Sequence, residues 1–223
     1  MTVKSHSKSG YMKIFIAFAV AGFSFLSFTC LSHSKQDGWI SLFDGTLNNW
    51  KVGKNATTFS IEDGCIKVNG PVAHLYYDGP VKKHIFRNFE FKAEVKTLPG
   101  SNSGIYFHTS YQEAGWPDRG YEVQVNNSHT DWRRTGSLYD IVDISETYAK
   151  DNEWYTEYIK VEGKHVIIKV NDKVVVDYTE PCDVVREDNH PLRLITGGTF
   201  ALQGHDPKSI VYYRNIMVKP LAD

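Results

Sequence analysis

Cysteine, net charge and long apolar runs are all scarce in this sequence, and each shortage excludes a class of protein. The formal net charge is −1 and the sequence pI is about 6.8, so no basic face for nucleic acid is expected. Only three cysteines occur, and Cys65 and Cys182 are too distant in the sequence to show metal-ligand spacing. An oxidising compartment would allow these two to pair, but the sequence does not give the distance between their Cα atoms, so pairing stays open.

The one long apolar run, Ile14 to Phe28, follows Lys4, Lys8 and Lys13. It has about 15 residues, fewer than the ~20 of a membrane-spanning helix, and a basic start before such a run is typical of a secretory signal peptide. Cys30 stands where a bacterial lipoprotein signal places its lipid-acceptor cysteine. We therefore expect a periplasmic or outer-membrane lipoprotein that meets the membrane only through this anchor, or alternatively a plain secretion signal with an incidental cysteine. The predicted organisation is a signal peptide over 1–30, a linker over 31–37 and one domain over 38–223.

Helical periodicity is missing as well. Outside the signal no convincing 3.6-residue apolar period occurs, whereas alternating and β-branched runs dominate from Trp39 onward. The clearest run, YIKVEGKHVIIKVNDKVVVDY (158–178), predicts three strands joined by two short turns. Residues 143–151 could form a helical turn. Many short strands with almost no helix predict a single all-β domain, built as a sandwich, jelly roll or barrel.

Polar residues of an unusual kind share one face of three predicted strands. Successive side chains of a strand point to opposite faces, so the core-facing apolar residues of segments 102–110, 121–125 and 199–205 assign the other residues to the outer face. A solvent face is commonly rich in Lys, Glu and Thr, but this set is rich in amides, imidazoles and a phenol, which suits a sugar groove. Its members are Asn102, Tyr106, His108, Glu122, Gln124, Gln203 and His205. Each could also be an ordinary surface residue, and Glu122 and His205 are the least easily explained in that way.

Six phrases in one order resemble the 3-keto-disaccharide hydrolase domain family of the concanavalin A-like superfamily, which is common in secreted and lipoprotein chains of Bacteroidetes-type bacteria. They are GWISLFDGTLNNW (38–50), NSGIYF (102–107), GYEVQV (120–125), TGSLYD (135–140), ALQGH (201–205) and YYRNIMVKPL (212–221). The resemblance covers residues 38 to 221. It implies a concanavalin A-like jelly-roll β-sandwich of two antiparallel sheets, one of which forms a sugar groove. It also implies a glycoside hydrolase or lyase acting on substrates whose glucose unit carries a ketone at C3.

Such a ketone makes the C2 proton acidic, so a base can remove it and the C1 substituent can leave, after which water adds. Direct hydrolysis of the glycosidic bond is the other route. The elimination needs a base and donors aimed at the enolate oxygen. Glu122 or His205 could be the base. The candidate donors are His205, Gln124, Gln203, Arg134 and Arg214, although Arg214 could equally be a structural ion-pair partner. Trp116 and Arg134 lie in loop phrases that suit stacking and hydroxyl contacts with the carbohydrate substrate.

A retaining glycosidase would instead need two acids close together, often on one strand. Gln124 stands where the second acid would be, which argues against that mechanism, although acids from loops could contribute: Asp118, Asp140 or Asp143.

Two further alternatives concern ligands. His108, Glu122 and His205 could ligate a metal, but no tight ligand spacing demands one, so neither a metal nor a cofactor is predicted. The fold implied by the resemblance also occurs in lectins, so the second function to test is a module that binds carbohydrate without turning it over.

Overall fold

The computed structural model describes residues 1–3, 38–186 and 190–223. The predicted signal peptide, its Cys30 and the linker lie outside the described residues apart from residues 1–3, so the lipid anchor and the location of the protein stay predictions. Within the described part, no helix is long and apolar enough to cross a membrane.

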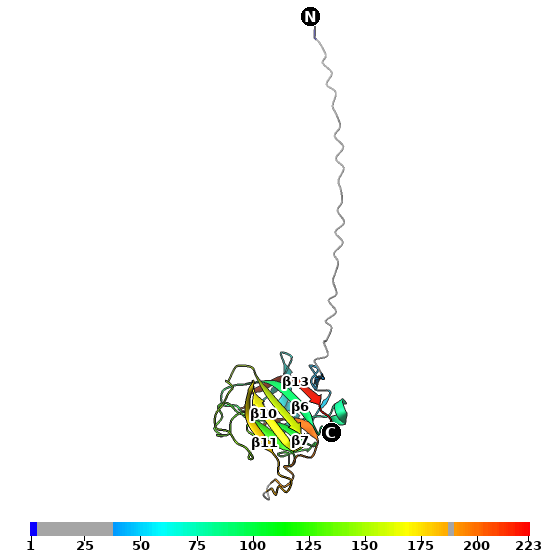
Figure 1. Ribbon diagram of the computed structural model, residues 1–223. Coiled ribbons are helices and arrows are strands. Elements are labelled where there is room, and N and C mark those ends of the chain that lie inside the picture. Colours follow the sequence, from blue (N-terminus) through cyan, green and yellow to red (C-terminus); the bar gives the residue numbers. More distant parts are fainter. Residues whose placement is uncertain (4–37, 187–189) are drawn as a thin grey trace. The chain divides into compact units, whose positions relative to one another are not determined.

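Two antiparallel sheets make up the domain (Figure 1). The larger sheet runs in the order β11 (Lys173–Thr179), β10 (His165–Val170), β9 (Tyr155–Glu162), β6 (Phe89–Thr97), β13 (Val211–Pro220), β4 (Cys65–Val68) and β3 (Phe59–Glu62), with β1 (Ile40–Ser41) also paired to β13. The smaller sheet runs in the order β2 (Trp50–Val52), β5 (Ala73–Tyr77), β12 (Thr199–Gly204), β7 (Ser103–Thr109) and β8 (Tyr121–Val125). Two 3₁₀ turns, η1 (Ala56–Thr58) and η2 (Val81–His84), are the helical elements of the described residues. The predicted all-β fold of two antiparallel sheets is confirmed.

The hairpins over 155–179 follow the predicted turns. Strands β9, β10 and β11 pair in sequence, and the turns place Gly163 and Asn171 at φ values of 60° and 54°. Glycine and asparagine adopt this left-handed conformation more easily than other residues, which explains their presence there. The helical turn that the sequence allowed at 143–151 does not form, because this segment is irregular.

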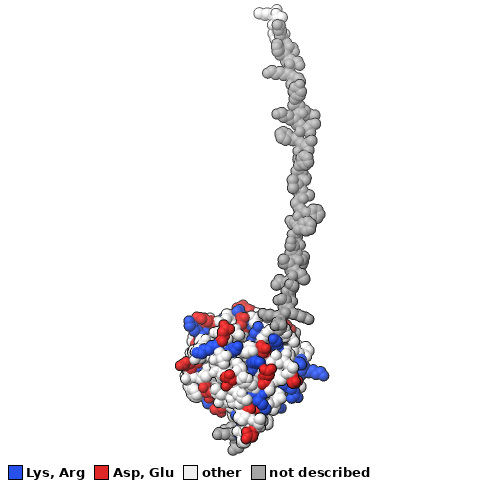
Figure 2. Space-filling view, viewed as in Figure 1, with Lys and Arg blue, Asp and Glu red and all other residues white. Residues whose placement is uncertain are grey.

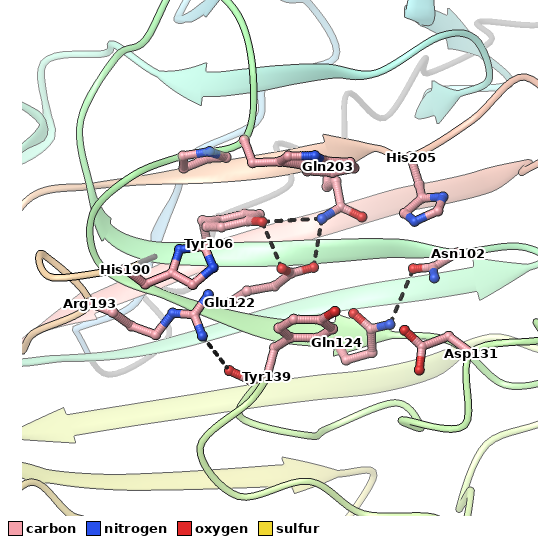
Figure 3. Close-up of a pocket in the computed structure, with 12 residues that line it drawn as sticks. Asn102, Tyr106, Glu122, Gln124, Asp131, Tyr139, His190, Arg193, Gln203 and His205 are labelled. Carbon is pink, nitrogen blue, oxygen red and sulfur yellow. Dashed lines mark hydrogen bonds between the residues drawn. The ribbon is translucent and has the colours of Figure 1, made fainter. Parts of the chain in front are cut away.

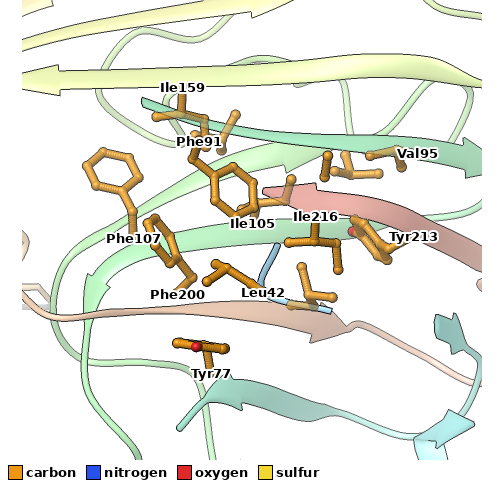
Figure 4. Packing of buried hydrophobic residues seen from close by; sticks show 14 of the residues in the cluster. Leu42, Tyr77, Phe91, Val95, Ile105, Phe107, Ile159, Phe200, Tyr213 and Ile216 are labelled. Carbon is orange, nitrogen blue, oxygen red and sulfur yellow. The ribbon is translucent and has the colours of Figure 1, made fainter. Parts of the chain in front are cut away.

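Aromatic and aliphatic side chains from both sheets form the core between them (Figure 4). The Phe200 ring of the smaller sheet lies with its centroid 4.7 Å from that of Phe91 and 4.9 Å from that of Phe89, both in β6. The same ring lies 4.7 Å from Phe86. Ring pairs at these separations add favourable contacts beyond the burial of their area, so Phe200 is a central contact between the two sheets.

The outer faces of the two sheets differ. In β6 and β9 of the larger sheet, buried residues alternate with half-buried or exposed ones, the pattern of a sheet with one face in solvent. In β5, β7, β8 and β12 of the smaller sheet every residue is buried. Loops must therefore cover the outer face of the smaller sheet, and Asn102, Tyr106, Glu122, Gln124 and Gln203, which were predicted for that face, are buried beneath them.

On the face seen in Figure 2, the basic and acidic side chains of the described residues are interspersed. Cys65 is buried and Cys182 is exposed, and both are free thiols, so the open question of a disulfide between them is answered: they do not pair.

Glu157 is a carboxyl group inside the core. It belongs to the inward-facing set of β9, is fully buried, and neither carboxyl oxygen has a hydrogen-bond partner. Burial disfavours the charged form and raises the pKa of Glu157 well above its usual value of 4.5. Burial without a partner therefore favours the neutral, protonated form of this side chain in the folded protein.

We expect Glu157→Gln to remove a pH-dependent loss of stability. The pKa of Glu157 is higher in the folded than in the unfolded state. Its contribution to the free energy of unfolding is therefore fully present below the unfolded pKa, near 4.5, and is lost as pH rises towards the folded pKa. The loss is up to about 1.4 kcal/mol per pH unit. Thermal unfolding followed by circular dichroism should show a larger fall in Tm from pH 5 to pH 8 for the wild type than for Glu157→Gln. Equal falls in the two proteins would contradict this assignment.

Candidate functional site

A cavity of about 180 Å³ lies on the outer face of the smaller sheet (Figure 3). Strands β7, β8 and β12 supply its floor, and the loops around them supply its walls. Its lining is Asn102, Tyr106, Trp116, Pro117, Glu122, Gln124, Asp131, Tyr139, His190, Arg193, Gln203 and His205. Seven of the residues predicted from the sequence thus converge on one cavity, which is the geometric condition that a catalytic site requires.

Glu122 occupies the floor of the cavity. The Tyr106 hydroxyl donates a hydrogen bond of 2.7 Å to Glu122 Oε2, and Gln203 Nε2 donates one of 2.6 Å to Glu122 Oε1. Gly104, on the neighbouring strand β7, leaves the space for this carboxylate, because a Cβ atom there would lie 2.3 Å from Glu122 Oε1. The carboxylate therefore has a fixed position set by three residues of two other strands.

Burial also sets the charge of this carboxyl group. Glu122 is 7% exposed, and burial raises its pKa to about 7, opposed by the hydrogen bonds from Tyr106 and Gln203, which favour the charged form. A carboxylate with a pKa near neutrality is suited to accept a proton at that pH.

Three carboxamides lie around Glu122. Gln124 Nε2 donates a hydrogen bond of 3.3 Å to Asn102 Oδ1, and the Gln203 amide nitrogen faces Glu122 while its oxygen points towards His205 (Figure 3). The amide oxygens of Gln124 and Gln203 have no hydrogen-bond partner. Buried polar atoms in proteins are nearly always paired, so these two oxygens are acceptors for water or for hydroxyl groups of a ligand.

His205 follows the end of β12 and forms a pair with Asp206, whose Oδ2 lies 2.9 Å from the imidazole Nδ1. The Asp206 carboxylate also accepts hydrogen bonds from the Ser209 hydroxyl and from the backbone N–H groups of Lys208 and Ser209. These contacts lower the pKa of Asp206 to about 2, against the effect of its burial. The carboxylate thus holds a proton on Nδ1 of His205 and leaves Nε2 as the free ring nitrogen.

His129, His205 and Asp206 are the one group of described residues whose potential metal-ligand atoms all lie within 4.8 Å of one another. Their atoms already have other partners. His129 Nδ1 accepts the Asp131 backbone N–H at 3.1 Å, and both Asp206 oxygens are hydrogen-bonded. A cation could bind all three only by replacing these contacts, so the cluster fits a hydrogen-bonded His–Asp pair better than a metal centre.

Four residues in the wall of the cavity were not found from the sequence. Arg193 donates to the Tyr139 carbonyl oxygen at 3.3 Å and lies 3.5 Å from Asp140 Oδ2; its positive charge lowers the pKa of Glu122. Asp131 and Tyr139 come from the loop over 126–144. His190 and Arg193 come from the connection between β11 and β12, and no local pattern marks them as cavity residues.

Buried Glu180 joins the two ends of the connection between β11 and β12 by hydrogen bonds. It accepts hydrogen bonds from the Tyr121 hydroxyl, from Lys164 Nζ and, at 2.8 Å, from the backbone N–H of Ile195. Arg186 Nε donates to the Arg193 carbonyl oxygen at 2.9 Å. The position of the Arg193 guanidinium thus depends on an acid at the base of its loop.

The placement predicted for His108 is wrong. Phe107 and His108 both lie opposite Phe200, because the register of β7 and β12 shifts there, and His108 has a φ of 56°. This bulge turns the imidazole away from the cavity and towards Phe89, whose ring centroid is 5.6 Å away. Nε2 donates to the Arg87 carbonyl oxygen at 2.9 Å, and burial lowers the pKa of His108 to about 4. It is a neutral, buried histidine.

The two predicted arginines also lie away from the cavity lining. Arg134 Nη1 donates to the carbonyl oxygens of His129 and Asp131, at 2.9 and 2.6 Å, so it holds its own loop together. Arg214 belongs to β13 in the larger sheet and donates from Nε to Glu94 Oε2 at 2.6 Å. The structural reading of Arg214 therefore holds, and Arg193 is the cavity arginine.

Fold and site together define a β-sandwich with a sugar-type pocket: a few convergent polar groups on one sheet and an exposed Trp116 ring in the loop between β7 and β8. The model of the 3-keto-alpha-glucoside-1,2-lyase-like domain matches residues 38–219. A 3-keto-disaccharide hydrolase from Bacteroides thetaiotaomicron is 31% identical over 233 aligned residues, which cover 83% of this chain and 79% of the relative. The chain belongs to this family of carbohydrate-processing enzymes, as the resemblance of its motifs predicted.

Solved structures agree on the fold. Two candidate glycosyl hydrolases from Parabacteroides distasonis superpose with TM-scores of 0.70 and 0.65 at 21% and 23% identity. The alignments cover 83% and 82% of this chain and 94% and 99% of those chains. The carbohydrate-binding module CBM66 of Bacillus subtilis superposes with a TM-score of 0.54 at 12% identity, over 77% of this chain and 95% of that chain. The concanavalin A-like jelly roll is thereby confirmed.

We expect Gly104→Ala to destabilise the protein through its clash with the Glu122 carboxylate. Overpacking of this kind costs about 1–3 kcal/mol. The double variant Gly104→Ala/Glu122→Ala removes the clashing atoms, so the cost of the Gly104 change should largely disappear in that background. Urea unfolding of the four proteins of this cycle measures the coupling. Additive effects of the two changes would show that the close approach is not the cause.

Proposed function

We propose that the protein cleaves 3-keto-glucosides, including 3-keto-disaccharides, by removing the C2 proton and expelling the C1 substituent. The observation that carries the proposal is the Glu122 carboxyl group, buried at the floor of the cavity with a pKa of about 7 and fixed by Tyr106 and Gln203. The family description, a 3-keto-alpha-glucoside-1,2-lyase-like domain, supports elimination over direct hydrolysis.

The first step is a proton transfer. Glu122 takes the proton from C2, and the electron pair of that C–H bond forms the C2=C3 double bond of an enolate whose charge lies on the C3 oxygen. Donors near that oxygen stabilise the charge before the next step. The Arg193 guanidinium is the one arginine side chain among the cavity-lining residues, and the Tyr106 hydroxyl and Gln203 amide are the other donors beside Glu122.

The second step breaks the glycosidic bond. The enolate collapses to a C1=C2 double bond conjugated with the restored C3 ketone as the bond from C1 to the aglycone oxygen breaks. The aglycone leaves as an alcohol because its oxygen takes the proton that Glu122 removed from C2, passed on through Nε2 of His205. His205 is the group suited to exchange protons with that oxygen and with water, because Asp206 orients its ring and its Nε2 is free. Addition of water across the new double bond returns a 3-keto sugar and completes a net hydrolysis.

Carbohydrate binding without turnover is the second candidate. The likeness to a carbohydrate-binding module at the level of fold favours it, but such a module gains nothing from a buried carboxyl group with a raised pKa. One experiment distinguishes the two functions. An enzyme releases the chromogenic aglycone of a 3-keto-glucoside, whereas a binding module binds the intact glucoside without releasing it.

We expect Glu122→Gln to lower kcat for release of the chromogenic aglycone by about 10²–10⁴-fold, the usual contribution of a general base. In the wild type kcat/KM should fall as pH drops below about 7, because protonation of a base with that pKa inactivates it. Stopped assays between pH 5 and pH 9 measure both effects. A Glu122→Gln protein of undiminished activity, or a wild type without turnover, would refute the proposal.

Arg193 and Arg214 form a matched pair for testing the enolate donor. Arg193→Gln should lower kcat by about 10²-fold or more, as loss of one charge-stabilising donor does in other enzymes. Arg214→Gln should leave kcat within about twofold, since its guanidinium binds Glu94 on the other sheet. Steady-state kinetics of both variants on the same substrate gives the comparison, and equal effects of the two changes would exclude a specific role for Arg193.

A further inference from the structure

A second cavity, of about 280 Å³, lies at the end of the same sheet. Its lining includes Tyr76 and Tyr77 at the end of β5, Thr109 at the end of β7, and residues of the segment that follows β7. Ala201 in β12 pairs with Tyr76 on one side and with Tyr106 on the other. Tyr76 and Tyr106 therefore stand two strand spacings apart, about 10 Å, one lining each cavity.

Two buried hydroxyl groups of this cavity lining lack partners. Thr109 is 1% exposed and Tyr76 is 2% exposed, and neither hydroxyl oxygen makes a hydrogen bond. The Gln112 backbone N–H affects the pKa of Tyr76 but does not meet hydrogen-bond geometry. Arg119 Nε is unpartnered as well. Groups of this kind normally have hydrogen bonds, and a ligand rich in hydroxyl groups would supply them.

Apolar surface stands beside these groups. Tyr111 and Ile85, which are 38% and 54% exposed, both line the cavity, and the Tyr111 ring packs edge-on against Tyr76 at 5.5 Å. Ile85 follows a strained stretch in which Lys82, Lys83 and His84 all have φ values near 50°. Such strain in non-glycine residues is costly and often marks a ligand-binding segment.

Each charged side chain at the rim contacts another side chain. Lys51 lies with its Nζ 3.7 Å from the centre of the Tyr111 ring, Arg119 contacts the Thr196 hydroxyl, and Asp78 lies 3.5 Å from His84. The only carboxylate of the lining is the Asp78 side chain, which is 54% exposed, so the cavity has no buried acid resembling Glu122. It is therefore suited to binding rather than catalysis, and to a neutral ligand, because Lys51, Arg119 and Asp78 already have partners.

We propose that this second cavity binds a pyranose ring of an unoxidised, neutral saccharide, with the Tyr111 ring as platform and the Thr109 and Tyr76 hydroxyls as hydrogen-bonding partners. The inference rests on the proposed function only for the class of ligand, which is carbohydrate. The site would hold a second sugar on the same face of the sheet as the first cavity, so that a saccharide is retained whether or not it carries the C3 ketone.

The test is a titration of the Glu122→Gln protein with maltose and with maltotriose, followed by backbone-amide NMR. Saturable shifts are expected at Thr109, Tyr111 and Gly198. The dissociation constant should rise about tenfold in Thr109→Val or Tyr111→Ala, which corresponds to the loss of one good contact. Tyr111→Phe keeps the aromatic platform and should bind as before.

Trp132→Ala is the matched control, because Trp132 is a 52% exposed aromatic residue that lines neither cavity. The affinity of this variant for maltose and maltotriose should equal that of the parent protein. No saturable shift, shifts confined to Asn102, Gln124 and Gln203, or undiminished binding by both Thr109→Val and Tyr111→Ala would overturn the proposal. Should Thr109→Val fail to fold, the surface change Tyr111→Ala decides alone. Turnover of the chromogenic 3-keto-glucoside by the wild type tests the first cavity separately, so the two proposals can fail independently.

Discussion

The burial of one carboxyl group, that of Glu122, is the constraint on which the site depends. A buried carboxylate is costly unless it is hydrogen-bonded, and here Tyr106 and Gln203 provide the bonds while Gly104 provides the room. The same burial raises its pKa towards neutrality. Stability and chemistry are thus two consequences of one arrangement: the strands that hold the carboxyl group in place also give it the proton affinity of a base.

Loops make that burial possible. The smaller sheet would have a solvent face were it not covered, and the loops that cover it carry their own polar frameworks. Arg134 binds the carbonyl oxygens of its loop, and Glu180 fastens the segment that bears Arg193. Charged residues that do not touch the cavity therefore decide where the cavity-lining ones lie.

The sequence predicted correctly which residues share a face wherever the strands are regular. Alternation along β8 and β12 assigned Glu122, Gln124 and Gln203 to the outer face, and the structure places them in the cavity. The same argument fails at His108, because a bulge in β7 is invisible to a period of two. Arg193 could not be predicted for a different reason. It lines the same cavity as Glu122 but lies in a loop some seventy residues further along the chain, and no local sequence pattern encodes that proximity. The family resemblance supplied the substrate class, which no residue pattern could.

Strand β7 lies between β12 and β8 and is covered on both faces. Its amide protons are therefore protected from solvent at both edges and cannot exchange through fraying of an open edge. The residues that hold Glu122 consequently belong to the most slowly opening part of the domain, where local opening without global unfolding is rare. Heat should then release Glu122 from Tyr106 and Gly104 only at the temperature at which the fold itself is lost.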